Sequence, residues 1–292
     1  MLTPETACEG DKTVLFRLPG ALVRAALVVM LVVMPYALLP QQGDDVSLII
    51  SLVAVFAALF TIVEYVGSSP SLVEFRDAPP FNRVRFSALF ATVLCLSVIF
   101  RGGEIPSAAS DLFQYCGSAI GAAIDFPYSP ARLMLDLMPV GTDPATLDWM
   151  RDAAGLSYLL VSFSVIWFVI LLRLYRWRRR TEAFNVWVNL PTFNPTTGGD
   201  VVKRLRRDAR FNILLGFAAP FLAPGVIALI GAFGTPISLD STQTLIWTIA
   251  AWAFLPANLL MRGIAISRIA YMIDLQRRRA YGDREAGIRR YA

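Results

Sequence analysis

The sequence predicts an all-α membrane protein with six transmembrane helices, on three observations. Hydrophobic residues make up 56% of the chain and charged residues only 17%, which is too apolar for a soluble domain of 292 residues. Six long apolar runs divide the sequence. Of the 27 lysines and arginines, all but Arg101, Arg132 and Arg151 lie in alternate linkers or toward the chain ends, which is the positive-inside distribution of a polytopic membrane protein.

A transmembrane helix needs about 20 apolar residues, and six segments of the chain approach this length. They are residues 20–39, 46–66, 84–100, 153–174, 211–233 and 245–261. The first is too long for a signal-peptide core and follows acidic residues, so we expect no cleaved signal peptide. The third is short, and it can span only if Arg83 and Arg85 reach back to the membrane surface. The sixth is expected to continue as a helix through Arg268 and Asp274.

The charge of the linkers orients these segments. Residues 101–152 carry an excess of acidic side chains and are expected outside, whereas residues 173–210 and the tail 275–292 are basic and expected in the cytoplasm. Both termini are then cytoplasmic, and residues 1–292 form a single integral membrane domain because the linkers are too short to fold alone. The 25 arginines against 2 lysines are typical of a GC-rich bacterial genome, so we expect a location in the bacterial cytoplasmic (inner) membrane.

The external linker contains an amphipathic helix by its spacing. Four apolar residues form one helical stripe, namely Leu112, Cys116, Ile120 and Ile124. Gly117 and Gly121 lie beside this stripe and would let another helix approach closely. We expect a helix parallel to the membrane on its external side. It is either an interfacial cover lying on the lipid or a docking surface for a protein partner.

Two cytoplasmic linkers also have informative composition. The second carries an arginine cluster at the membrane surface, made up of Arg176, Arg178, Arg179 and Arg180. This cluster is either a topological anchor or a site for anionic lipid headgroups. The glycines at 198–199 lack the spacing of a phosphate-binding loop, so we expect no nucleotide there. The first linker, around Glu74 and Arg76, is charge-dense and contains Pro79 and Pro80, which predicts a structured turn.

Charged residues within or beside the spans are candidates for function because they are costly in lipid. Arg24 and Glu64 lie at similar depth in the first and second spans, so we expect them to pair. Arg262 and Asp274, together with Arg268, are expected to form an interfacial group on the sixth helix. No charge falls at a predicted bilayer midplane, which weighs against an ion-coupled pump.

Prolines interrupt the later spans. The fifth contains Pro220, Pro224 and the adjoining Gly225, and the sixth contains Pro256. Proline removes a helical hydrogen bond and bends the helix. Broken helices line substrate sites in some transporters, although proline is also common in membrane helices generally. We expect a bend near residues 220–225 whose lost hydrogen bonds are compensated by neighbouring helices.

Enzymatic chemistry finds little support in this sequence. The chain has no histidine, no GxSxG or HExxH motif and no carboxylate pair within a span, so the usual Ser/His and metal-ligating routes are closed. Its three cysteines, Cys8, Cys95 and Cys116, are widely separated and predict neither a disulfide nor a zinc site. We therefore expect no metal and no cofactor.

These observations favour a non-enzymatic integral subunit, or an assembly or scaffolding factor, of a bacterial membrane complex. The alternative is a transporter or permease subunit whose kinked fifth helix lines the pathway, and a membrane enzyme acting on lipids is the third possibility. The expected partners are membrane lipids and other membrane proteins. Nucleic acid is not expected, because the basic residues flank apolar segments.

Overall fold

The structure is a computed structural model that describes residues 4–40, 44–67, 70–76, 79–138, 141–174, 189–194, 198–233 and 241–291. Within these residues the chain forms helices and no strands. The helices are α1 (Pro4–Leu38), α2 (Asp44–Val66), α3 (Pro79–Gly102), α4 (Ala108–Ile124), α5 (Pro130–Leu135), α6 (Pro144–Leu174), α8 (Val201–Phe233) and α9 (Thr242–Tyr291).

Six of these helices, α1, α2, α3, α6, α8 and α9, are long and apolar enough to cross a membrane. The predicted fold class is therefore confirmed. Five of these six helices, all except α2, extend several residues beyond their predicted spans. The third apolar helical segment runs from Pro80 to Gly102 and is not short, and α9 continues through Arg268 and Asp274 to Tyr291.

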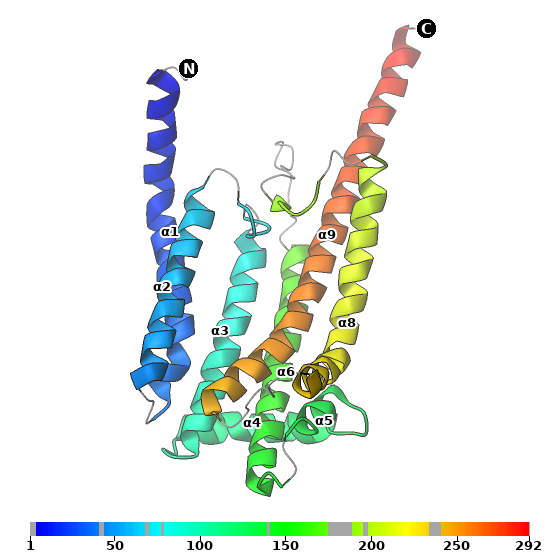
Figure 1. Cartoon of the computed structure of the whole chain (residues 1–292). Coiled ribbons are helices and arrows are strands. Elements are labelled where there is room, and N and C mark those ends of the chain that lie inside the picture. The colour runs from blue at the N-terminus through cyan, green and yellow to red at the C-terminus, as the bar shows by residue number, and fades with distance from the viewer. Residues whose placement is uncertain are drawn as a thin grey trace.

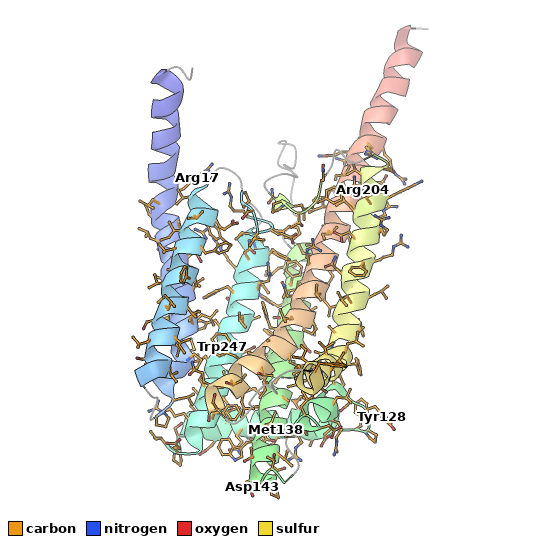
Figure 2. The ribbon with its side chains drawn as sticks, in the orientation of Figure 1. Arg17, Tyr128, Met138, Asp143, Arg204 and Trp247 are labelled. Carbon is orange, nitrogen blue, oxygen red and sulfur yellow. The ribbon has the colours of Figure 1, made fainter. Side chains whose placement is uncertain are left out.

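The long helices run side by side, and both chain ends lie at one end of the bundle, here called the terminal end (Figure 1). Helices α4 and α5 lie across the opposite end. Figure 2 shows Arg17 and Arg204 toward the terminal end, and Tyr128, Met138 and Asp143 at the opposite end. Helix α2 stands at the edge, where α1 is the one helix it contacts within the described residues.

Buried side chains form two main clusters. One joins α1, α3, α6 and α9 and includes Leu31, Leu96 and Ile246. The other lies nearer the terminal end around Phe81, Phe168 and other large side chains. Alanines line much of the buried face of α9, namely Ala250, Ala253, Ala257, Ala265 and Ala270. Small side chains let membrane helices approach closely, which strengthens the van der Waals contacts that hold them together in lipid.

Helix α4 packs directly against the backbone of α6. A Cβ atom on Gly121 would lie 2.7 Å from the carbonyl oxygen of Arg151, and one on Gly155 of α6 would lie 2.7 Å from the Cα atom of Gly121. Gly117 meets the backbone of Asp152 in the same way. The close approach expected at Gly117 and Gly121 thus takes place within the chain, because α6 occupies that face.

The stripe predicted to be the covered face of α4 is not its most buried face. Leu112 is 57% exposed, whereas Cys116, Ile120 and Ile124 are half-buried. The fully buried residues are Ser110, Gly117 and Gly121. Two helix backbones in contact leave no room for branched side chains between them, so the glycines and not the apolar stripe form the interface.

The fifth span, in α8, is continuous but changes direction toward its C-terminal part (Figure 1). Pro224 has no N–H to donate to the carbonyl oxygen of Pro220, four residues earlier. The indole Nε1 of Trp252, from α9, donates to that oxygen at 3.1 Å. A neighbouring helix therefore replaces the hydrogen bond that the second proline removes.

Replacing Trp252 with Phe is expected to destabilise the protein by about 1–3 kcal/mol, because it leaves the buried carbonyl of Pro220 without a donor. The measurement is unfolding in mixed micelles, followed by circular dichroism. Trp247→Phe is the matched control, since the indole nitrogen of Trp247 donates no hydrogen bond within the described residues. Equal losses for the two variants would show that the Trp252 bond contributes nothing beyond ring packing.

Candidate functional site: a polar junction at the terminal end

The loop after α2 is held by one buried carboxylate. Glu64 accepts hydrogen bonds from the backbone N–H groups of Ser71, Leu72 and Val73 at 3.0–3.1 Å, and from the hydroxyl of Ser71. Arg76 returns to the end of the same helix and donates to the carbonyl oxygen of Gly67 at 2.6 Å. These bonds fold residues 70–76 back onto α2 and fix the position of the residues that follow Val73.

The expected ion pair between Arg24 and Glu64 is wrong. Arg24 donates to the carbonyl oxygen of Gly20 at 2.6 Å, and its guanidinium lies 4.6 Å from the centre of the Tyr65 ring. Arg24 therefore contacts Tyr65, the residue that follows Glu64 in α2, but not Glu64 itself. The carboxylate is already satisfied by the loop backbone, whose donors are local and need no long side chain to be ordered.

Four segments meet at Arg262 of α9. Its guanidinium donates to both carboxylate oxygens of Glu74, with Nε–Oε2 at 2.7 Å and Nη2–Oε1 at 2.9 Å, and to the side-chain oxygen of Asn212 of α8 at 2.8 Å. Thr192 donates to Glu74 at 2.9 Å. Asp208 adds a second carboxylate 3.8 Å from Arg262. These five residues form the polar junction, which ties two loops to α8 and α9.

The backbone around Glu74 is tightly specified. Phe75 is fully buried with a φ of 54°, a left-handed conformation that is unusual for a bulky residue. Its N–H donates to the carbonyl of Asn189 at 2.8 Å, and Asn82 donates to the carbonyl of Glu74 at 2.9 Å. The Phe75 ring packs 4.3 Å from that of Phe81, centre to centre. These contacts stabilise the strained turn.

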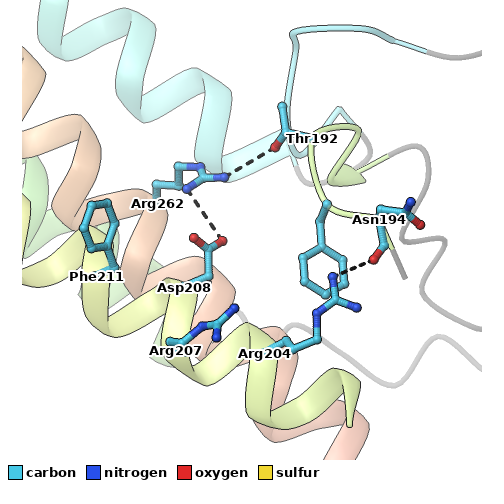
Figure 3. A pocket seen from close by; sticks show the side chains of 8 residues that line it. Thr192, Asn194, Arg204, Arg207, Asp208, Phe211 and Arg262 are labelled. Carbon is cyan, nitrogen blue, oxygen red and sulfur yellow. Dashed lines mark hydrogen bonds and ion pairs between the residues drawn. The ribbon is translucent and has the colours of Figure 1, made fainter. Parts of the chain in front are cut away.

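A half-open pocket of about 470 Å³ lies beside the polar junction (Figure 3). Its lining residues are Thr192, Phe193, Asn194, Arg204, Arg207, Asp208, Phe211 and Arg262. Arg204 lies over the ring of Phe193 at 4.8 Å and donates to the carbonyl of Asn194 at 2.8 Å. Arg207 is exposed, and its side chain forms no ion pair or hydrogen bond within the described residues. The lining therefore combines three guanidinium groups, one carboxylate and two aromatic rings.

Asp274 does not share a group with Arg262, contrary to expectation. It pairs with Arg206 of α8 at 3.0 Å and with Arg278 at 3.4 Å. Twelve helical residues separate Arg262 from Asp274, which is about 18 Å along the axis. Arg262 and Asp274 therefore join α9 to neighbouring segments at two different heights along its axis.

A third contact joins the start of α8 to α9. Asp200 accepts from the backbone N–H of Val202 at 3.0 Å and from Arg277 at 2.7 Å. The hydrogen bond from Arg277 holds the pKa of the Asp200 carboxyl below its ordinary value. The contact is solvent-exposed, so it adds little to stability.

Sequence reasoning missed the role of Glu74. It placed this residue in a charge-dense turn but assigned it no partner, because Arg262 lies 188 positions later in the chain. The arginine cluster Arg176, Arg178, Arg179 and Arg180 lies outside the described residues.

No family model, no curated protein and no solved structure matches this chain. Among the residues that the structure describes, no group of three His, Cys, Asp or Glu side chains could hold one metal ion. A guanidinium paired to two carboxylate oxygens keeps its proton, so the polar junction is suited to electrostatic binding and not to proton transfer.

Proposed function

We propose that this chain is a non-enzymatic integral subunit, or an assembly factor, of a membrane complex. The observation that carries the proposal is the isolation of α2. This helix contacts α1 and no other helix in the described part of the chain. Its outward side is a continuous apolar surface, formed by Leu48, Leu52, Val55, Leu59 and Val63, and all five are exposed.

The apolar surface of α2 is what a partner helix would use. The most apolar window of α2 is 17% buried, as is that of α8, against 50% for that of α9; α2 differs from α8 in contacting a single helix. The buried side of α2 carries Thr61 and Glu64 and is used by α1 and the loop. Helix α2 contributes no described side chain to either main buried cluster, so its apolar outer surface is better explained by a contact with another protein.

We also propose a location in the bacterial cytoplasmic membrane with the terminal end in the cytoplasm. The support is the arginine distribution, since Arg17 and the basic start of α8 at Arg204 lie toward that end (Figure 2). Alkaline phosphatase is active only outside the cytoplasm. Phosphatase activity of a fusion at Gly198 would contradict this orientation.

A transporter subunit is the second candidate because α8 contains Pro220 and Pro224 and changes direction toward its C-terminal part (Figure 1). Helix α9 packs closely against α8 next to these prolines. A Cβ atom on Gly216 would lie 2.9 Å from the carbonyl oxygen of Pro256, and Trp252 donates to Pro220. The bend therefore supports a tight helix pair better than it supports a pathway.

Photo-cross-linking at Leu59 tests the subunit proposal. A photoreactive amino acid at this outward position of α2 is expected to give a discrete protein adduct of constant mass in native membranes. The matched control is Phe217, which is 70% exposed on the outward side of α8 and should give lipid adducts only. If Leu59 and Phe217 both give lipid adducts alone, α2 faces lipid and the subunit proposal loses its support.

A further inference from the structure

One face of α8 changes from basic to apolar within about three helical turns. Arg204, Arg207, Phe211 and Leu214 are spaced three, four and three residues apart, so they lie along one stripe of the helix. Phe211 and Leu214 are 63% and 69% exposed. A stripe of this kind is typical of a helix that passes from the lipid headgroup layer, where the arginines lie, into the hydrocarbon, where the apolar side chains lie.

The half-open pocket lies at this change of polarity (Figure 3). Arg262 forms one wall, and its donors are already engaged by Glu74, Asn212 and Asp208. Arg207 is differently placed, because it lines the same pocket and its side chain has no protein partner within the described residues. An arginine with free donors beside a cavity is suited to an anionic group, and guanidinium matches phosphate oxygens in geometry.

Arg204 lies about one helical turn before Arg207 on α8 and is pre-positioned beside the same pocket. Its guanidinium is held over Phe193 and against the carbonyl oxygen of Asn194, which limits its rotamers before any ligand binds. Ordering a long side chain in advance lowers the entropy lost on binding. The pocket volume of about 470 Å³ lies in the range that suits a small ligand or headgroup.

We propose that this pocket binds the phosphate headgroup of an anionic phospholipid. Arg207 and Arg204 donate to the phosphate, and an acyl chain descends along Phe211 and Leu214. The apolar continuation of the stripe distinguishes this ligand from a free phosphate ester, which would use the arginines alone. The proposal is independent of whether α2 has a protein partner.

The test is a titration of the full-length protein, purified in a neutral detergent, with phosphatidylglycerol and with phosphatidylcholine, with bound lipid counted by native mass spectrometry. We expect one saturable phosphatidylglycerol site that phosphatidylcholine does not fill. Arg207→Gln should weaken phosphatidylglycerol binding about tenfold, which corresponds to about 1.4 kcal/mol. Because Arg207 is exposed, this variant should keep the wild-type helix content.

Arg210→Gln is the matched control. Arg210 is exposed on the same helix, does not line the pocket and donates within the helix to the carbonyl of Arg206. It should leave binding unchanged, although it removes the same charge. Equal losses for the Arg207 and Arg210 variants would overturn the site and leave only a diffuse basic surface.

A soluble ester distinguishes the two sources of phosphate. Glycerol phosphate is expected to compete only weakly, and Phe211→Ala should weaken phosphatidylglycerol binding while leaving competition by glycerol phosphate unchanged. If glycerol phosphate binds as tightly as the lipid, the pocket recognises a soluble phosphate ester and the lipid assignment is wrong.

Discussion

Replacing Glu74 with Gln is expected to lower the free energy of unfolding by about 2–4 kcal/mol, the largest effect of any single charge in the described chain. The substitution keeps the shape of the side chain but leaves Arg262 without its main counter-charge. Breaking a buried pair costs about 3–5 kcal/mol because the remaining charge is poorly solvated. The side chain of Arg262 is 22% exposed, so water recovers part of that cost.

The unfolding of the Glu74 variant can be followed by circular dichroism as the denaturing detergent fraction is raised. Asp274→Asn is the matched control, because its partner Arg206 has a side chain that is 52% exposed and such pairs contribute about 0–1 kcal/mol. Combining Glu74→Gln with Arg262→Gln should recover part of the loss, since no charge then remains buried. A Glu74 variant no weaker than the Asp274 control would mean that the polar junction does not hold the loops.

Replacing Gly155 with Ala is expected to separate α4 from α6. A Cβ atom at this position would meet the backbone of Gly117 and Gly121, and a backbone cannot move aside as a flexible side chain can. Overpacking a tight interface costs about 1–3 kcal/mol and occasionally more. We expect a value at the upper end of that range, because every nearest atom belongs to backbone.

The displacement of α4 can be measured through Cys116, which is half-buried beside Leu156 and Ile99. Its thiol should react faster with a maleimide in the Gly155 variant than in the wild-type protein. Gly225→Ala is the control, because a Cβ atom there meets nothing within 4 Å. Unchanged reactivity in the Gly155 variant would show that α6 shifts to accommodate the methyl group and α4 stays in place.

The sequence by itself determined the six membrane helices, the amphipathic helix at α4 and the prolines that bend α8. Each of these follows from local properties. A bilayer admits only segments long and apolar enough to satisfy their own backbone. Amphipathic spacing and proline chemistry likewise depend on residues within a few positions of one another.

Only the tertiary structure decided which groups meet. Matched depth suggested that Arg24 pairs with Glu64, but the loop backbone provides nearer donors for that carboxylate. Glu74 and Arg262 form an ion pair through both carboxylate oxygens, although 188 positions separate them. The depth of a residue in the membrane and the spacing of apolar residues do not fix how each helix is rotated about its own axis. They do not fix the path of each loop either. Packing sets both, so it decides which polar atoms lie close enough to bind one another.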